Sequence, residues 1–187
     1  MSFIDTDREL TRHSYYAATA PRPQVFSPLP AGESACDVAV VGGGLAGLSA
    51  AIELRERGLA VTLLEAQHIG HGASGRNGGQ AIYGLACDMT TIEDQLGREA
   101  ARQVFAMSLE AIDLIRQRIA RFAIDCDWRE GYLGVATNQR KARALRDEVE
   151  LLAERYDHAL TWVAQSDLPQ WIDSPRYVAA AHDPRSG

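Results

Sequence analysis

The sequence lacks a hydrophobic run that could cross a bilayer as a helix, because its longest apolar stretch, residues 38–52, is too short and is interrupted by glycines. The start of a secretory signal peptide is also missing, since the chain begins with the polar, acidic stretch MSFIDTDREL. We therefore expect a cytoplasmic protein with no membrane span.

Lysine is almost absent, with Lys141 the only one among 19 cationic side chains. The formal net charge is −6 at pH 7. An acidic chain of this kind has no electrostatic footprint for nucleic acid or for an anionic membrane. The composition therefore predicts no nucleic-acid partner.

Cysteine is scarce as well, and Cys36, Cys87 and Cys126 are widely spaced and odd in number. This spacing excludes a disulfide framework and the paired pattern of zinc ligands. We expect three reduced thiols, buried as small apolar residues. The five histidines are scattered along the chain, so no metal site is predicted.

A strand–turn–helix–strand pattern is the most informative feature that the sequence does contain. Its parts are a strand, a glycine turn, a helix and a second strand, at residues 37–41, 42–44, 45–57 and 60–64. Gly42, Gly44 and Gly47 form G-x-G-x-x-G in the context where it indicates a dinucleotide site. Gly42 permits the sharp turn, Gly44 lacks the Cβ that would hold off a pyrophosphate, and Gly47 allows close packing of helix and sheet.

The ends of the helix and of the second strand complete this pattern. Leu45 and Ala46 begin the helix, whose unpaired N–H groups and positive dipole end attract phosphate. Glu65 follows the second strand, 18 residues after Gly47, where its carboxylate can accept hydrogen bonds from ribose hydroxyls. A lone glycine motif is often a coincidence, and an acid at a strand end is usually just solvated. Their combination at this spacing favours a dinucleotide site.

The loop at residues 70–80, GHGASGRNGGQ, favours FAD over NAD as the dinucleotide. It leaves the strand end that carries the acid, and it contains five glycines. Arg76 could neutralise phosphate charge, and Ser74 and Asn77 could hydrogen-bond phosphate or ribityl oxygens. A flexible surface loop is the alternative for such a composition. A simple NAD site, however, has no use for this second element.

The end of the same loop could contact the flavin ring. Gly78 and Gly79 would let the backbone lie against a flat ring system. Gln80 and Asn77 are candidates for contacts with the flavin edge. Catalytic residues stay unknown, because no nucleophile–base order, paired acids or nearby lysine accompanies the loop.

These residues resemble the D-amino-acid-oxidase-type flavoproteins, and within them the gamma-glutamylputrescine oxidoreductases. Agreement with that subgroup extends to SYYAATA, IDCDW and GYLGVATN, at residues 14–20, 124–128 and 131–138. The resemblance implies FAD binding and oxidation of a C–N bond of an amine or amino acid. It maps the FAD-contacting positions of the family onto Gly42, Gly44, Gly47, Glu65, Ser74, Arg76, Asn77, Gly78 and Gly79.

Length is where this chain departs from the family, whose members are longer. The resemblance implies that the chain corresponds to an N-terminal portion, which lacks later strands of the FAD domain and later active-site residues. We therefore expect no amine turnover from residues 1–187 alone. A missing C-terminal segment or a partner chain would complete the pocket.

The rest of the chain predicts mixed helices and strands. Residues 91–122 are helical and divided at Gly97, with an apolar stripe of Val104, Ala111, Ile115, Ile119 and Phe122. Strands are expected at 124–128, 133–137, 160–164 and 177–181, a helix at 140–155, and a short helix capped by Ser166. Trp128, Tyr132 and Trp171 could line a substrate pocket, but core positions are the more usual role of aromatics at such spacing.

The predicted fold is α/β, a Rossmann-like FAD-binding βαβ domain followed by the start of an α+β substrate domain. The expected divisions are an N-terminal arm at 1–35, the first part of the FAD domain at 36–122 and a partial substrate domain at 123–187. The predicted function is FAD-dependent oxidation of an amine or amino acid, with a gamma-glutamylputrescine-like substrate. The alternatives are a non-catalytic FAD-binding module and, opposed by the second glycine loop, an NAD-dependent dehydrogenase.

Overall fold

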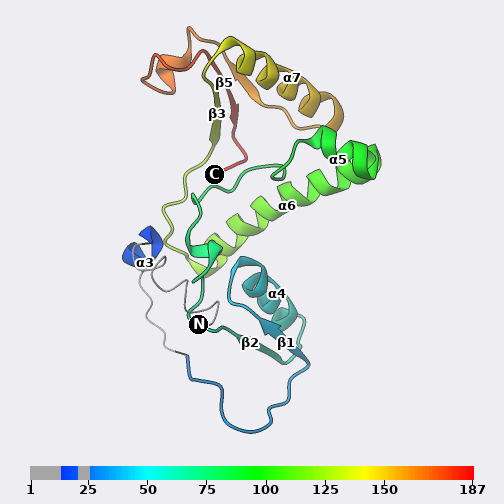
Figure 1. Ribbon diagram of the computed structural model, residues 1–187, viewed down its shortest axis with the longest axis vertical. Coiled ribbons are helices and arrows are strands. Elements are labelled where there is room, and N and C mark those ends of the chain that lie inside the picture. The colour runs from blue at the N-terminus through cyan, green and yellow to red at the C-terminus, as the bar shows by residue number, and fades with distance from the viewer. Residues whose placement is uncertain (1–13, 21–25) are drawn as a thin grey trace, which may run out of the picture. The chain divides into compact units, whose positions relative to one another are not determined.

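The computed structural model describes residues 14–20 and 26–187. The chain divides into two compact units, residues 1–79 and 80–187, and each is described by itself (Figure 1). Of the N-terminal arm predicted at residues 1–35, the structure thus describes residues 14–20 and 26–35. The division between the compact units falls after Gly79. The domain boundary predicted at residue 123 stays a prediction.

A parallel β–α–β element forms the centre of the first unit. It consists of β1 (Val38–Val41), α4 (Leu45–Glu56) and β2 (Val61–Leu64), with Val38 opposite Val61 and Val41 opposite Leu64 (Figure 1). Helix α4 packs on both strands. Gly58 ends the helix region with φ +88, a left-handed conformation that favours glycine. The predicted strand, helix and second strand are therefore present, each shifted by a residue at one end.

The two strands differ in how far their side chains are covered. Ala39 and Val41 of β1 are exposed, so β1 is not buried on both faces. Within this unit the sheet has two strands and a helix on one face only. The first unit by itself therefore leaves apolar side chains of β1 exposed to solvent.

A short helix, α3 (Tyr15–Thr19), also belongs to the first unit. Ser14 is its N-cap, and the Ser14 hydroxyl accepts a hydrogen bond from the Ala17 N–H at 3.5 Å. Between β2 and the end of the first unit, the chain forms the 3₁₀ helix η1 (Ala73–Gly75). The remaining part of the glycine-rich loop has no regular secondary structure.

Two consecutive helices, α5 (Met89–Leu96) and α6 (Arg98–Phe122), begin the ordered part of the second unit. Gly97 separates them with φ +80, so the predicted division of the helix at this glycine is confirmed. The helices pack on each other, and α6 also contacts α7 (Gln139–Tyr156) (Figure 1).

A three-stranded antiparallel sheet lies next to these helices in the second unit. Its order is β3 (Tyr132–Ala136), β5 (Ala179–Asp183) and β4 (Thr161–Val163), so the last strand in the sequence is the central one. Helix α7 contacts β3 and β5, and a short 3₁₀ helix η2 (Leu168–Gln170) joins β4 to β5. The largest hydrophobic core cluster of this unit combines buried residues from its helices, from β5 and from the segment before β4: Met89, Ile92, Ala101, Phe105, Leu152, Tyr156, Leu160 and Ala181.

Two elements of the second unit differ from the sequence prediction. Residues 124–128 form no strand, because Asp127 has φ +50 and follows the left-handed Ala123, φ +48, and neither conformation fits an extended ladder. The N-cap residue of the short helix η2 is Asp167 and not Ser166, because the helix begins at Leu168.

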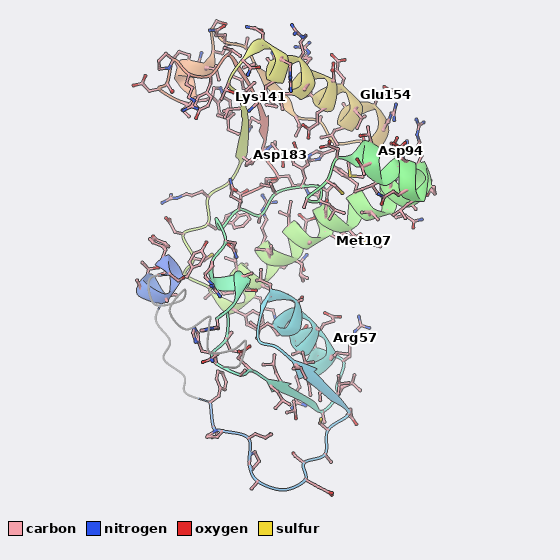
Figure 2. All side chains as sticks on the ribbon, in the orientation of Figure 1. Arg57, Asp94, Met107, Lys141, Glu154 and Asp183 are labelled. Atoms are coloured by element: carbon pink, nitrogen blue, oxygen red, sulfur yellow. The ribbon has the colours of Figure 1, made fainter. Side chains whose placement is uncertain are left out.

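The buried face of α6 also differs from the predicted stripe. Ala101, Phe105 and Ile112 are its buried residues, whereas the predicted Ile115 and Phe122 are 41% and 49% exposed. The buried face is the one that meets α7, where the Phe105 and Tyr156 rings lie 4.9 Å apart. Met107 projects away from this face (Figure 2).

The three thiols are exposed, so the prediction that they are buried is wrong. Cys36 and Cys126 lie outside regular elements, where no neighbouring layer covers them, and Cys87 lies in the loop before α5. Among the described residues, no helix is long and apolar enough to cross a membrane.

Candidate functional site

The glycine turn between β1 and α4 is fixed by its own backbone. Gly42 has φ +102, and its N–H donates to the carbonyl of Leu64 at 2.8 Å, which ties the turn to the end of β2. A Cβ on Gly47 would lie 2.0 Å from the carbonyl oxygen of Gly42. The absence of a side chain at Gly47 therefore lets the first turn of α4 lie directly against the strand end.

The N-terminus of α4 faces the hydroxyl of Ser74. Gly44 is the N-cap and has no side chain to cap the helix, and the Leu45 N–H donates to Ser74 Oγ at 2.9 Å. A Cβ on Gly44 would lie 2.9 Å from the same oxygen. The structure thus brings together two residues 30 positions apart, Gly44 and Ser74, at a helix end that attracts anions.

Glu65 lies at the carboxyl end of β2 and reaches back over the glycine turn. Its Oε2 accepts a hydrogen bond from the Gly43 N–H at 2.6 Å, and its Oε1 accepts one from the Gln67 N–H at 2.9 Å. A carboxylate has about four lone-pair sites, so both oxygens keep acceptor capacity for further donors.

The same environment keeps Glu65 ionised. Burial raises the pKa of its carboxyl, but the N–H groups of Gln67 and Gly43 and the neighbouring His71 lower it by more. The net result is a pKa below the usual value of 4.5. At neutral pH the site therefore presents a carboxylate that only accepts hydrogen bonds.

Gly43 is a site residue that the sequence analysis missed. Its carbonyl accepts a hydrogen bond from the Gly70 N–H at 2.9 Å, and a Cβ at this position would lie 2.6 Å from Ile69 Cδ1. The middle glycine of the run at residues 42–44 thus lets the loop after β2 lie against the turn. The sequence signal for Gly43 is the run of three consecutive glycines at residues 42–44, because the G-x-G-x-x-G motif requires glycine only at the first and third of these positions.

The predicted loop residues Arg76 and Asn77 fold the loop onto itself. The Arg76 guanidinium donates to the carbonyls of Gly72 and His71 at 3.3 and 3.4 Å. Asn77 Nδ2 donates to the Ser74 carbonyl at 3.0 Å, and its Oδ1 accepts from the Gly79 N–H at 2.9 Å. These contacts hold the segment that carries Ser74 next to α4.

A histidine pair precedes this segment and was also missed. The Nδ1 atoms of His68 and His71 lie 3.1 Å apart, so one of them donates to the other. Their rings meet edge to face, with centroids 4.5 Å apart. Because His71 also acts on Glu65 electrostatically, the pair belongs to the surroundings of the carboxylate.

The remaining predicted residues belong to the second unit. Gln80 begins the second unit, and its contact with a flavin stays a prediction. Trp128 and Tyr132 are half-buried and Trp171 is 45% exposed. A cavity of about 400 Å³ in the second unit lies between α6 and α7, and none of the three aromatic residues lines it. A substrate pocket built on these three residues stays a prediction.

The residues at the turn fit the adenosine and pyrophosphate part of a dinucleotide. A backbone without Cβ atoms, a helix N-terminus and an ionised acceptor lie within one hydrogen-bonded arrangement. Phosphate oxygens require donors and ribose hydroxyls require an acceptor, and both are present here.

Solved structures show where this fold recurs. An L-amino acid deaminase from Proteus vulgaris superposes with a TM-score of 0.66 at 24% identity, over 87% of this chain and 40% of that one. A glycine oxidase from Bacillus cereus superposes with a TM-score of 0.57 at 21% identity, over 82% of this chain and 39% of that one. At these identities the likeness establishes the fold.

Curated relatives are more similar in sequence. Gamma-glutamylputrescine oxidoreductase from Escherichia coli is 41% identical over 95% of this chain and 42% of its own length. The probable oxidoreductase OrdL from Haemophilus influenzae is 40% identical over 93% of this chain and 40% of its own length. The chain thus spans about two fifths of the length of these relatives. Residues 37–187 match the DAO family of FAD dependent oxidoreductases, and the chain belongs to this family.

Proposed function

We propose that the chain binds FAD and that its first unit holds the adenosine and pyrophosphate part of the cofactor. The observation that carries this proposal is the arrangement of Glu65 and Ser74 on either side of the glycine turn, each hydrogen-bonded to a backbone N–H of the turn or helix start. Family membership supports the choice of FAD.

Each part of the arrangement has a role in this proposal. The N–H groups of Leu45, Ala46 and Gly47 lie in the first turn of α4, where a helix has no internal acceptors for them. The Leu45 N–H would keep its hydrogen bond to Ser74, and those of Ala46 and Gly47 would donate to the pyrophosphate. Ser74 would donate its hydroxyl proton to a phosphate oxygen while still accepting from Leu45. The Glu65 carboxylate would accept from the ribose hydroxyls.

The loop would continue from the phosphates toward the flavin ring. Arg76 adds positive charge beside Ser74, while Asn77 and the positive-φ Gly79 shape the backbone that would lie along the cofactor. Gly78 and Gln80 are proposed contacts at the end of this loop. Tight backbone approach, not a side-chain pocket, would hold this part of the cofactor.

We propose that the reaction is the oxidation of a C–N bond in an amine or amino acid. Bound FAD supplies the two-electron oxidant for such a reaction. The Escherichia coli relative is named gamma-glutamylputrescine oxidoreductase, which supports this substrate class. A gamma-glutamylputrescine-like amine is the first substrate to test. The second unit, with its three-stranded sheet, is the part of this chain proposed to face the substrate.

A titration of the apoprotein with FAD, followed by flavin fluorescence, tests cofactor binding. Glu65→Gln should raise the dissociation constant about tenfold or more, because the substitution removes the charge and one acceptor from the ribose contacts. Glu53→Gln is the matched control, since Glu53 is an exposed acid on α4 that pairs with Arg57. Recovery of NAD without flavin, even after reconstitution, would contradict the proposal.

An assay of amine oxidation separates the enzyme from a binding module. Purified chain loaded with FAD is mixed with gamma-glutamylputrescine, and oxygen or dye reduction is followed beside the Escherichia coli relative as a positive control. Turnover supports the oxidoreductase for this chain alone. FAD binding without turnover supports a module that requires further sequence or a partner to complete its pocket.

A further inference from the structure

The short helix α3 contacts the glycine-rich loop although it lies about sixty residues earlier in the sequence. Ser14 Oγ donates to the Gly75 carbonyl at 2.6 Å, across 61 positions. The Tyr16 hydroxyl donates to Asn77 Oδ1 at 3.4 Å, also across 61 positions. A Cβ on Gly79 would lie 2.6 Å from the same hydroxyl, so Tyr16 sits directly over that residue. All of these residues belong to the first unit.

Among the described residues, helix α3 is attached to the rest of the first unit through this loop. It is five residues long, and none of them is buried. Isolated helices need roughly 12–15 residues to be even marginally stable in water, so this helix depends on its contacts. Its capping by Ser14 orders the segment internally but does not attach it to anything. The hydrogen bonds from Ser14 to Gly75 and from Tyr16 to Asn77 attach it to the predicted FAD-contacting loop.

The contact with Asn77 leads on to the start of α4. Asn77 Oδ1 accepts from both the Tyr16 hydroxyl and the Gly79 N–H, and this orients the amide so that Nδ2 donates to the Ser74 carbonyl at 3.0 Å. Ser74 Oγ in turn accepts from the Leu45 N–H. Hydrogen bonds therefore run from Tyr16 through Asn77 and Ser74 to the helix end where the pyrophosphate is proposed to bind.

We infer that residues 14–20 are a cofactor-positioning strap, in which Tyr16 and Ser14 hold residues 73–79 in the conformation that receives FAD. This inference rests on the proposed function and extends it to a segment outside the β–α–β element. Tyr16 is a positioning residue that acts through Asn77. Loss of its hydroxyl frees the Asn77 amide to rotate and loosens the loop, whereas the β–α–β element stays intact.

Limited trypsin digestion tests the strap without any cofactor. Arg76 lies in the middle of the held loop, so trypsin cleavage between Arg76 and Asn77 reports how often the loop opens. Tyr16→Phe and Ser14→Ala should each raise the rate of this cleavage about threefold to tenfold, as expected for the loss of one hydrogen bond. Tyr15→Phe is the matched control, because the Tyr15 side chain is 75% exposed. Cleavage after Arg57, in the same unit, is the internal reference, and its rate should not change.

A titration with FAD and a spectrum of the bound flavin test the link to the cofactor. Tyr16→Phe should raise the FAD dissociation constant about threefold to tenfold. At saturating FAD it should also displace the visible absorption bands, which a general loss of stability would not do. Unchanged cleavage at Arg76 in both variants, with FAD binding equal to wild type, would overturn the inference. If the wild-type chain binds no FAD, the proposed function fails, whereas faster cleavage at Arg76 would still support a strap that holds the loop.

Discussion

Two glycines of the same motif are required for different reasons. The Cβ that an alanine would add at Gly47 meets the backbone oxygen of Gly42, which cannot move without opening the turn. The Cβ added at Gly44 meets only the hydroxyl of Ser74, which can rotate away. Gly47 is therefore required by the packing of α4, while the reason proposed for Gly44 is the approach of the cofactor to the turn.

Alanine substitutions should separate these two requirements. Gly47→Ala should lower the free energy of unfolding by about 3 kcal/mol, because the 2.0 Å contact with Gly42 forces the backbone apart. Gly44→Ala should cost about 1 kcal/mol or less, yet weaken FAD binding at least tenfold. Urea unfolding and FAD titration measure the two quantities. Gly72→Ala is the control, since a Cβ there has nothing within 4 Å and φ is −76°. Equal unfolding free energies for Gly47→Ala and Gly72→Ala would contradict this assignment.

The pKa of Glu65 makes a prediction for acid pH. Because its folded pKa lies below 4.5, ionised Glu65 stabilises the folded state above that value. This contribution should be lost as the pH falls from about 4.5 through the folded pKa of the carboxyl. Unfolding monitored between pH 7 and pH 3 should therefore be less pH-dependent in Glu65→Gln than in wild type. An identical pH dependence in the two proteins would show that Glu65 has no depressed pKa.

At the scale of elements, α6 shows why a helix face can be misread. The helix carries apolar residues on more than one face, so periodicity alone offers several stripes. Tertiary packing selects among them: Phe105 contacts Tyr156 of α7 and Ile112 is buried, whereas the predicted Ile115 is exposed. Which stripe is buried therefore depends on tertiary contacts that a local pattern does not contain.

A matched pair of isoleucines tests this selection. Ile112→Ala should lower the free energy of unfolding by about 2–5 kcal/mol, since the side chain is 2% exposed and its loss leaves a cavity. Ile115→Ala should change it by about 0.5 kcal/mol or less, since its side chain is 41% exposed. Chemical unfolding of both variants decides the matter. A larger loss of unfolding free energy in Ile115→Ala than in Ile112→Ala would show that the predicted stripe is the buried one.

The sequence was sufficient to predict the β–α–β element but only part of the candidate site. Strand, turn and helix at residues 37–57 follow from local spacing, and the break at Gly97 follows from its backbone freedom. Gly43 against Ile69 and Tyr16 against Asn77 could not be predicted, because these contacts join residues far apart in the sequence. Residues 124–128 were mistaken for a strand since apolar and aromatic side chains there outweighed the charge pattern of Asp125 and Asp127.

At the scale of the whole molecule, a buried polar cluster stabilises the second unit. Asp183 is almost fully buried at the end of β5 (Figure 2). It accepts hydrogen bonds from the Arg185 N–H at 3.1 Å and from the N–H and hydroxyl of Ser186. His158 Nε2 lies 3.4 Å from it, after the end of α7. The cluster thus connects the region after α7 to the central strand.

This cluster should make the second unit sensitive to mild acid. Burial lowers the pKa of His158 below 6.5, an effect that Asp183 opposes and Arg185 increases. The unfolded chain then binds a proton more readily than the folded one, so stability should fall as the pH drops from about 6.5 to the folded pKa. Thermal unfolding from pH 8 to pH 5 measures this loss, which should be reduced in His158→Gln. A loss that is unchanged in that variant would assign the sensitivity to another group.

The position of β5 in its sheet has a consequence for how the protein is made. Within the described part of the chain, β3 and β4 are not neighbours, and each pairs with β5, which is the last of the three strands to be synthesised. On the ribosome, β3 and β4 therefore emerge with no strand of their own sheet to pair with, and α7 alone can shelter them until residues 179–183 follow. A chain released before residues 179–183 are added would contain β3 and β4 without the strand that pairs with both, and it would expose unpaired strand edges, the kind of surface that chaperones bind and from which aggregation begins.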